Sequence, residues 1–312
     1  MNILELKNVV KSFGDYKATN DVSFSVKEGS IFGLLGPNGA GKTTIIRQIT
    51  NIYMPDEGEI FLFGSKVSPK HQNRIGYLPE ERGLYKKLKV LEQLIYFGKL
   101  KGLSSKDAEA RARRWLIELG AADWADKKIQ DLSKGMQQKV QFISTILHEP
   151  EFLILDEPFS GFDPVNVDLI RNIILDLKSQ GKTIILSTHV MSQVEQLCDE
   201  LLLINKGKAV LSGEIREIKS RFGNNHLILE FSPDNSLVEN LKNIEIIERS
   251  SGRAEIKLLS GNGQSQDILK KLMESGASIS RFEISEPSLH EIFIQTVGEE
   301  NLNEEELAQI SN

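Results

Sequence analysis

The 312-residue sequence contains one cysteine and no hydrophobic run that could cross a membrane. A single cysteine, Cys198, excludes an internal disulfide framework and is typical of a reducing compartment. The longest apolar runs have the length of strands, far below the roughly 18 residues of a membrane helix. The first residues also lack the basic head and apolar run of a signal peptide. We therefore expect a soluble cytoplasmic protein, which would associate with a membrane only through a partner.

A surplus of basic residues is also missing. The chain has 38 basic and 44 acidic residues, which gives a formal net charge of −6 at pH 7. A nucleic-acid-binding surface needs the opposite balance, so we expect no nucleic-acid partner. Residues 298–312 contain five glutamates and no lysine or arginine, and the rest of the chain is close to neutral. We interpret 298–312 as a solvated, partly helical acidic tail.

Over the first two thirds of the chain, short apolar runs alternate with amphipathic segments. Charge-free runs of this kind are typical of parallel strands that are buried on both faces, with helices between them. The predicted buried strands are Ile31–Leu35, Phe152–Leu155, Ile184–Leu186 and Leu201–Ile204. The predicted helices are Thr43–Thr50, Val90–Leu100, Ala108–Leu119, Gly135–Leu147 and Val165–Leu177. Residues 90–129 form a helical subdomain in this interpretation, and the alternation in Ile3–Val10 and Val22–Val26 predicts antiparallel strands.

The composition changes after residues 222–225, which we interpret as a linker. The pattern that follows is strand, helix, hairpin, helix and strand, which predicts a small split βαβ domain of the ferredoxin type. The predicted elements are strand His226–Phe231, helix Asn235–Leu241, hairpin strands Glu245–Glu248 and Ala254–Leu258, helix Ser265–Glu274 and strand Ser278–Ile284. A closing helix from Pro287 carries Leu289, Ile292 and Phe293 on one face. The predicted domains are therefore 1–222, 226–297 and the tail.

This second domain shows no catalytic pattern, and we interpret it as regulatory or structural. The histidines outside position 189 do not cluster at the spacing of metal ligands, so we assign them no role. They are His71, His148, His226 and His290.

One segment matches the spacing G-x-x-x-x-G-K-[ST] of a phosphate-binding loop. Glycines at three positions allow successive backbone N–H groups to turn toward a phosphate, and the following helix adds its positive dipole end. Lys42 is expected to reach the β- and γ-phosphates, and the Thr43 hydroxyl is expected to bind Mg²⁺. The predicted nucleotide-binding residues of this segment are Gly36, Pro37, Asn38, Gly39, Ala40, Gly41, Lys42, Thr43 and Thr44.

The buried run from Phe152 ends in two carboxylates, Asp156 and Glu157. At the end of a strand, Asp156 can hold Mg²⁺ together with Thr43. Glu157 is then placed to orient or deprotonate the attacking water. These two residues turn a prediction of nucleotide binding into one of hydrolysis.

A further segment, Leu132-Ser133-Lys134-Gly135-Met136-Gln137-Gln138, places a serine hydroxyl and a glycine N–H at the start of a helix. This arrangement can bind a second anion. With this segment in place, the chain resembles the ATP-binding subunits of ABC transporters, whose signature is close to L-S-G-G-Q. The resemblance covers residues 1–222 and extends to the order of all the motifs.

The resemblance implies roles for further residues. Phe13 matches the aromatic residue that stacks on adenine, and His189 matches the histidine that senses the γ-phosphate. Glu80 lies in the loop that normally carries glutamine beside the metal, and the run 160–163 matches the loop after the catalytic strand. The fold implied is a P-loop NTPase core of the ABC ATPase type, with an antiparallel β subdomain and a helical subdomain. The small α+β ferredoxin-like domain follows this core.

The implied cofactors are ATP and Mg²⁺, and the implied partners are integral membrane permease subunits and a second ATPase subunit. Ser133 and Gly135 of one subunit would cap the ATP held by the other, so hydrolysis would depend on closure of a dimer. The chain would lie on the inner face of the membrane. An exposed apolar cluster that includes Leu84 and Tyr85 is expected to contact the permease.

The sequence departs from the family pattern at Lys134, in place of the first signature glycine, and at Glu80. Both changes resemble a bacterial exporter subgroup that includes sodium-extrusion ATPases, many of which carry a small C-terminal domain. Two alternatives stay open at this point: a soluble ABC ATPase that acts on ribosomes or nucleic acid, and a nucleotide-regulated binding module. The single phosphate loop, the absence of sustained heptads and the acidic balance disfavour the first. Glu157 and His189 disfavour the second.

Overall fold

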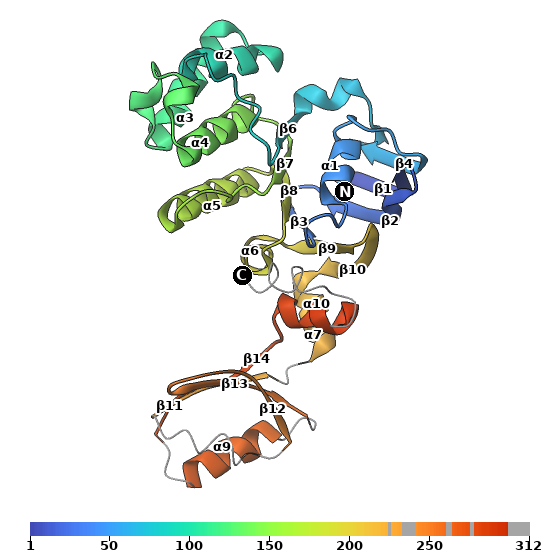
Figure 1. The fold of residues 1–312 in the computed structure, drawn as a ribbon, viewed down its shortest axis with the longest axis vertical. Coiled ribbons are helices and arrows are strands. Elements are labelled where there is room, and N and C mark those ends of the chain that lie inside the picture. Colours follow the sequence, from blue (N-terminus) through green and yellow to red (C-terminus); the bar gives the residue numbers. More distant parts are fainter. Residues whose placement is uncertain (224–225, 233–240, 242, 260–263, 275–277, 299–312) are drawn as a thin grey trace. The chain divides into compact units, whose positions relative to one another are not determined.

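The computed structural model describes residues 1–223, 226–232, 241, 243–259, 264–274 and 278–298. The chain divides into two units, Met1–Ile215 and Arg216–Asn301, which are described separately (Figure 1). The predicted helix Asn235–Leu241 falls outside the described residues apart from its last residue, as do linker residues 224–225 and the acidic tail beyond Gly298. The domain limits proposed from the sequence stay a prediction.

A six-stranded sheet forms the centre of the first unit, with the order β10-β9-β3-β8-β7-β6. Its strands are β3 (Ile31–Leu35), β6 (Ile75–Leu78), β7 (Phe152–Asp156), β8 (Thr183–Thr188), β9 (Glu200–Asn205) and β10 (Lys208–Glu214). All run parallel except β10, which is antiparallel to β9. The four predicted buried strands are confirmed, with slightly wider limits. The sequence analysis does not predict β6 or β10. Strand β6 is short and contains Gly76, and the side chains of β10 are exposed or only partly buried.

Alternate side chains of the central strands enter two different cores, because neighbouring residues of a strand point to opposite faces. In β7, Leu153 and Leu155 pack with helices on one face, whereas Phe152 and Ile154 pack on the other. All of these side chains are fully buried. Burial on both faces explains why β7 contains no charged residue before Asp156.

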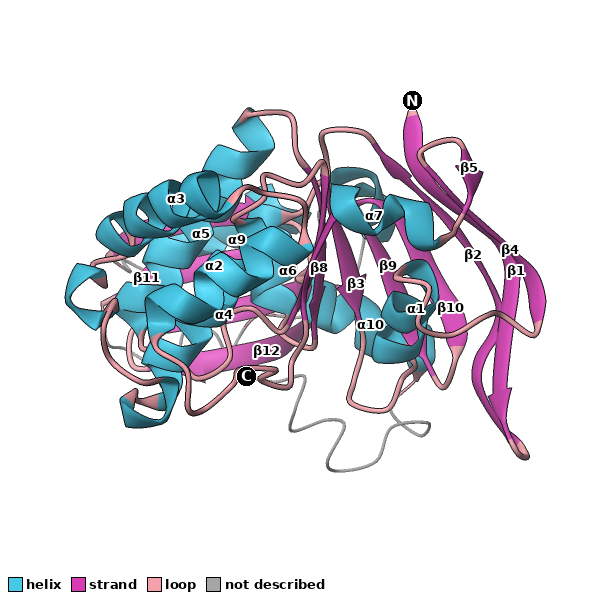
Figure 2. Ribbon diagram, turned by 90° about the horizontal axis from the view of Figure 1, so that it is seen from above, coloured by secondary structure: helices cyan, strands magenta, loops and turns pink. Residues whose placement is uncertain are grey.

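Helices cover both faces of the sheet in the first unit. They are α1 (Lys42–Ile49), α2 (Val90–Leu100), α3 (Ser105–Glu118), α4 (Lys134–Ile146), α5 (Pro164–Ser179) and α6 (Met191–Leu197). In Figure 2, α2 to α5 lie on one side of the central strands, and α1 lies on the other with an antiparallel sheet of order β2-β1-β4-β5. The strands of that sheet are β1 (Asn2–Phe13), β2 (Tyr16–Lys27), β4 (Glu57–Leu62) and β5 (Ser65–Lys66). The antiparallel and helical subdomains predicted from the sequence are both present.

The second unit contains a four-stranded antiparallel sheet of order β12-β13-β11-β14. Its strands are β11 (His226–Phe231), β12 (Ile244–Ser250), β13 (Arg253–Leu258) and β14 (Ile279–Ser285). The unit's helices are α7 (Ile215–Phe222, with Ile215 at the boundary), α9 (Gln264–Glu274) and α10 (Leu289–Val297). This strand order is the one expected of a split βαβ domain.

The closing helix begins later than the position of Pro287 suggested. Ser288 caps α10 by accepting a hydrogen bond from the Glu291 N–H, and Glu291 in turn accepts from the Ser288 N–H. This capping box fixes the start of the helix. Leu289, Ile292 and Phe293 are buried, as their spacing predicted. None of the described helices has the length and apolar character that a bilayer span requires.

Candidate functional site

The predicted site residues of the first unit gather where the parallel strands end. The phosphate loop follows β3, Asp156 and Glu157 lie at the end of β7, and His189 follows β8. Because β7 and β3 flank β8 in parallel, their carboxyl ends meet at one edge of the sheet. There they border a hollow of about 310 Å³. It is lined by Tyr16, Ala18, Asn38, Gly39, Gly41, Lys42, Thr43, Thr44, Glu80, Asp156 and Glu157.

The glycines of the loop are required by its backbone. Gly41 has φ +111°, and a Cβ there would lie 2.4 Å from the Ala18 carbonyl oxygen. A Cβ on Gly36 would lie 2.2 Å from the carbonyl oxygen of Ile204 in β9. Helix α1 starts directly after Gly41, with its N-terminal end at the hollow. The loop therefore combines a close backbone approach with a helix N-terminus, the arrangement that binds phosphate groups.

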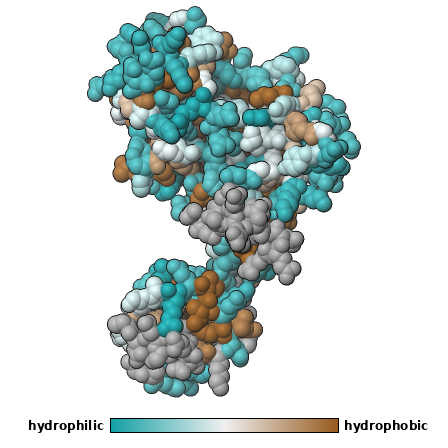
Figure 3. Space-filling model, viewed as in Figure 1, coloured by the Kyte–Doolittle hydropathy of each residue, from teal (hydrophilic) through white to brown (hydrophobic). Residues whose placement is uncertain are grey.

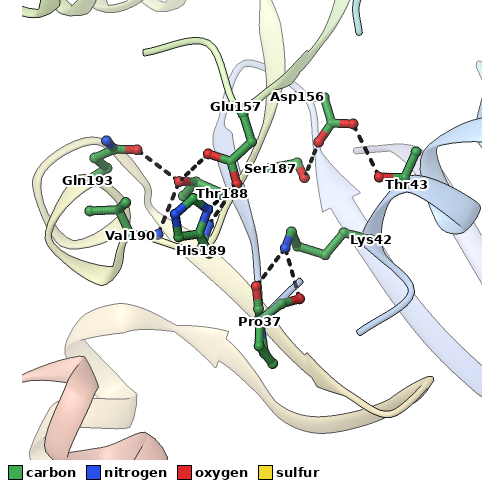
Figure 4. Close-up of polar contacts among 11 residues, drawn as sticks. Pro37, Lys42, Thr43, Asp156, Glu157, Ser187, Thr188, His189, Val190 and Gln193 are labelled. Atoms are coloured by element: carbon green, nitrogen blue, oxygen red, sulfur yellow. Dashed lines mark hydrogen bonds and ion pairs between the residues drawn. The ribbon is translucent and has the colours of Figure 1, made fainter. Parts of the chain in front are cut away.

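Lys42 lies in the first turn of α1 and is almost fully buried. Its ammonium donates hydrogen bonds to the carbonyl oxygens of Gly36, at 2.6 Å, and Pro37, at 3.1 Å (Figure 4). Burial lowers the pKa of Lys42, and the negative charges of Glu157 and Asp156 partly oppose this shift. The backbone of the loop thus holds the Lys42 side chain against the loop.

Asp156 is buried at the end of β7 and has two hydroxyl partners. Ser187 in β8 donates a 2.7 Å hydrogen bond to its Oδ1, and the Thr43 hydroxyl lies 3.4 Å from its Oδ2 (Figure 4). Burial raises the pKa of Asp156 to about 6, and the neighbouring Glu157 adds to the rise while the Ser187 hydrogen bond opposes it. The carboxylate is thus a costly buried charge that a cation would stabilise.

Glu157 is held by three groups from the last residue of β8 and the residue after it. Its Oε1 accepts hydrogen bonds from the His189 N–H, at 3.0 Å, and from His189 Nδ1, at 2.6 Å. The Thr188 hydroxyl lies 3.2 Å from its Oε2 (Figure 4). The hydrogen bond to Glu157 raises the pKa of His189. Glu157 also has φ +48°, a conformation that costs energy in a non-glycine residue and occurs often at functional sites.

Other predicted residues lie elsewhere in the unit. Ser133 is exposed and caps α4, where it accepts a hydrogen bond from the Met136 N–H, and Gly135 lies in the first turn of that helix. Neither lines the hollow. Phe13, at the end of β1, also stays outside the lining and contacts the ring of Tyr53 edge to face. The roles of these three residues stay predictions.

Three contributors were not singled out from the sequence. Ser187 and Thr188 contact the two carboxylates, although only the following His189 had been given a role. Their place in the last two positions of a buried strand was the signal that could have identified them. Tyr16 lines the hollow, and its hydroxyl donates to the Gly39 carbonyl oxygen at 3.1 Å. Tyr16 is separated from this loop by 23 residues in the sequence, so no local pattern indicates the contact.

Comparison with known proteins agrees with this geometry. The sequence pattern of the ABC transporter family matches residues 19–160, and that of the C-terminal domain of DrrA1-3-like ATP-binding proteins matches residues 213–297. The uncharacterized ABC transporter ATP-binding protein YhaQ of Bacillus subtilis is 43% identical over 296 residues. That alignment covers 95% of this chain and 99% of the relative.

Two further similarities cover about 70% of the chain each. The Nod factor export ATP-binding protein I of Cupriavidus metallidurans is 36% identical over 69% of this chain and 72% of the relative. A solved structure of an ATP-binding subunit of an ABC transporter is 31% identical, with a TM-score of 0.67. It covers 70% of this chain and 93% of its own. The ATPase core is therefore shared in both sequence and fold.

Proposed function

The chain belongs to the family of ABC transporter ATP-binding subunits, and from this we propose that it powers export through separate membrane subunits by closing as a dimer on ATP. As a member of this family it binds ATP and is an ATPase. The observation that carries the proposal is the meeting of the phosphate loop, Asp156, Glu157 and His189 at one edge of the sheet.

The phosphate loop is proposed to hold the triphosphate of ATP. Gly36, Gly39 and Gly41 allow the loop to curve around phosphate oxygens, and the N-terminus of α1 favours their negative charge. Lys42 would exchange its backbone carbonyl partners for the β- and γ-phosphates, which offer stronger, charge-assisted hydrogen bonds. Thr44 lines the same hollow, and Phe13 would stack on the adenine ring.

The residues around Asp156 fit a magnesium ion. The Thr43 hydroxyl and the Asp156 carboxylate face one another, Glu80 lines the same hollow, and hydroxyl and carboxylate oxygens are the ligands that Mg²⁺ prefers. A dication would also relieve the burial of the Asp156 charge beside Glu157. When bound, Mg²⁺ neutralises charge on the β- and γ-phosphates.

Glu157 is proposed as the general base that takes a proton from the attacking water, with His189 and Thr188 holding its carboxylate in place. The two oxygens of Glu157 are held by separate groups, so the side chain has a fixed direction. His189 Nδ1, 2.6 Å from Oε1, holds the carboxylate that would accept the proton. His189 would also sense the γ-phosphate, since it lies at the same strand edge.

Ser133 and Gly135 are proposed to complete the site of a second subunit. They lie at the N-terminus of α4, a suitable anion-binding position, yet they do not line the hollow of their own chain. Ser133 is exposed and therefore accessible to a partner. Closure of two chains would then supply these groups to ATP only in the dimer.

The loop after β6 is proposed to contact the membrane subunits. It borders a second hollow, which is lined among others by Leu84, Phe97 and Leu100. Tyr85 is 52% exposed and packs edge to face against Tyr96 of α2. An apolar, aromatic surface of this kind suits insertion of a partner helix. We expect Tyr85→Glu to abolish association with the membrane subunits while the isolated subunit keeps its ATPase activity; unchanged association would contradict this assignment.

The export direction rests on the relative named for Nod factor export, and stays part of the proposal. The membrane subunits would select the cargo. The sodium-extrusion subgroup remains an expectation from the Glu80 and Lys134 departures. The membrane protein that co-purifies with this chain should be identified first. Transport measurements in vesicles of defined orientation then test the direction of transport.

The decisive experiment is Glu157→Gln. The amide keeps the size of the side chain but cannot accept a proton, so we expect ATP binding to persist and turnover to fall by about 10²–10⁴-fold. Size-exclusion chromatography with ATP should show a trapped dimer, and phosphate release measures turnover. Glu118→Gln, on the exposed surface of α3, is the control and should leave turnover unchanged. Hydrolysis by Glu157→Gln at the wild-type rate would refute the general-base assignment.

A further inference from the structure

A cluster of one buried imidazole and two partly buried carboxylates lies in the C-terminal unit, and the proposed function uses none of the three. His226 begins β11, Glu255 lies in β13, and Glu291 lies in the first turn of α10. Their nearest ligand atoms all lie within 4.8 Å of one another. The three residues are separated in sequence and come together only in the folded unit.

His226 is only 1% exposed, yet neither of its ring nitrogens has a hydrogen-bond partner within the described part of the chain. Its Nδ1 lies 3.3 Å from Glu291 Oε1 and 4.0 Å from Glu255 Oε1, without the alignment of a hydrogen bond. A buried polar side chain without a partner is costly, and native proteins rarely leave one. Both ring nitrogens are therefore available to bind a ligand.

The two carboxylates are arranged as ligands rather than as partners of each other. Glu291 uses Oε2 for the capping box, where it accepts from the N–H of Ser288 at 2.7 Å and from its hydroxyl at 2.9 Å. Its Oε1 stays turned toward His226. Such a second contact orients a ligand oxygen and is typical of metal sites.

The charges of the cluster favour a cation. Glu255 and Glu291 face the same buried imidazole, and burial together with the negative Glu291 raises the pKa of Glu255. Arg253, a positively charged neighbour that opposes this rise, is exposed. Two carboxylates and one imidazole leave negative charge to be neutralised inside the unit.

We propose that His226, Glu255 and Glu291 bind one Zn²⁺ ion, which links α10 to strands β11 and β13. Zinc takes imidazole nitrogen and carboxylate oxygen at about 2.0–2.2 Å, which places neighbouring ligand atoms roughly 3.3 Å apart around a tetrahedral ion. The His226–Glu291 separation already equals this value, and Glu255 needs only a small side-chain movement. The imidazole disfavours Mg²⁺ and Ca²⁺, which prefer oxygen ligands alone.

The first experiment measures Zn²⁺ binding to the full chain after removal of metals by a chelator. Millimolar Mg²⁺ is kept present to occupy the oxygen-rich ATP site, and a fluorescent zinc chelator competes for the ion. We expect one Zn²⁺ per chain, with affinity at least about 100-fold weaker in His226→Gln. His290, next to Glu291 in the sequence, is the matched control. The variant His290→Gln should bind Zn²⁺ as the wild type does. Equal affinity in His226→Gln, or no stoichiometric binding by the wild type, overturns the proposal.

Glu255→Gln separates loss of a ligand from loss of folding. The amide removes one of two neighbouring negative charges that are partly buried, so the metal-free variant should melt at a higher temperature than the metal-free wild type. Added Zn²⁺ should raise the Tm of the wild type but not that of this variant. If Zn²⁺ raises both by the same amount, Glu255 is not a ligand and the site is overturned.

Co²⁺ spectroscopy and a variant of Ser288, which contacts Glu291, provide two further tests of the zinc site. Co²⁺ in place of Zn²⁺ should give a visible d–d absorption band in the wild type, and His226→Gln should lose it. Ser288→Ala, which removes the hydroxyl contact to Glu291 Oε2, should weaken Zn²⁺ binding by about 10-fold. A Co²⁺ spectrum that is unchanged in His226→Gln would place the ion elsewhere and refute the site.

Discussion

The two units of the chain distribute their polar side chains differently along the sequence. In the ATPase unit they come as short runs, residues 36–44, 156–157 and 187–189, each at the end of a parallel strand. In the C-terminal unit His226, Glu255 and Glu291 come singly from two strands and a helix. Parallel strands collect their ends at one edge, whereas antiparallel strands bring together residues that are distant in sequence. Motifs therefore reveal the first kind of site and not the second.

The two units also differ in how deeply their sheets are covered. Strands β3, β7 and β8 are buried along their whole length, whereas β12 is exposed over most of its residues. Ile246 and Ile247 of β12 are about 40% exposed, and Figure 3 shows apolar side chains gathered on one side of this unit. A sheet that is covered less buries less apolar area per residue. We therefore expect the C-terminal unit to be the less stable of the two.

The largest expected effect belongs to the phosphate loop and tests whether the two sites are independent. Lys42→Met removes the ammonium that the loop holds, and we expect ATP affinity to fall by about 10²–10³-fold. Zn²⁺ binding should stay unchanged, because its ligands lie in the other unit. Lys101→Met is the control: this lysine also donates to backbone carbonyls, but it lies outside the ATP hollow. Fluorescent ATP-analogue binding measures both, and wild-type affinity in Lys42→Met would contradict the assignment.

The next effect is the pH dependence of ATPase activity, which we expect to follow the buried Asp156 carboxylate at the end of β7. The pKa of Asp156 is raised to about 6, so kcat/KM for MgATP should fall below that pH as Asp156 takes up a proton. The Ser187 hydroxyl stabilises the ionised form. Its removal in Ser187→Ala should move the acid limb upward by about one to two pH units, which lowers activity at pH 7 by about 2–10-fold.

Activity of Ser187→Ala at pH 9 should approach the wild-type value, because Asp156 is ionised there in both proteins. Ser179→Ala, whose hydroxyl contacts only the Asp176 carbonyl oxygen on the surface of α5, is the control. A pH profile for Ser187→Ala that coincides with the wild-type profile would show that Asp156 does not limit the reaction on the acid side.

A smaller effect is expected at Glu80, where the chain departs from the family pattern. The side chain is exposed at the rim of the hollow, so its interactions are screened and contribute about 0.2–1 kcal/mol. Glu80→Gln should therefore lower kcat by less than about 5-fold at saturating Mg²⁺. Glu81→Gln, exposed and outside the lining, should have no effect. Complete loss of activity in Glu80→Gln would show that its negative charge is needed.

Local sequence patterns predict some parts of the fold and not others. The buried strands and the phosphate loop follow from local patterns, because their function requires particular residue types in consecutive positions. Strands β6 and β10 escaped prediction because neither has a charge-free apolar run of sufficient length. Their place in the sheet depends on neighbours, β7 for the first and β9 for the second.

In the two sites as well, some residues follow from the sequence, whereas others depend on how the strands pair. Asp156 and Glu157 were identified from the sequence, but the hydroxyl of Ser187 that tunes Asp156 was not, since the contact depends on the register of β7 against β8. The spacing of His226 in the sequence gives no sign of a metal site, because Glu255 and Glu291 lie 29 and 65 residues away. Pairing of β11 with β13, together with the capping box of α10, brings its two carboxylate neighbours to it.

The smallest expected effect on ATPase activity comes from the core of the C-terminal unit. Leu229 is 1% exposed and packs with Ile256, Ile268 and Leu272, all within that unit. Leu229→Ala should destabilise it by about 2–5 kcal/mol and lower its calorimetric transition. ATPase turnover at 25 °C should change by less than about 2-fold, since no residue of the ATP hollow contributes to this core.

Ile185→Ala is the matched variant in the central sheet. Ile185 is fully buried in β8, two positions before Ser187, so a cavity there disturbs the strand that carries the partners of Asp156 and Glu157. We expect a similar loss of stability but a clear loss of turnover. If Leu229→Ala lowers turnover as much as Ile185→Ala does, the C-terminal unit supports the ATPase reaction directly. Separate transitions with separate consequences would instead show that the ATP site depends on its own unit alone.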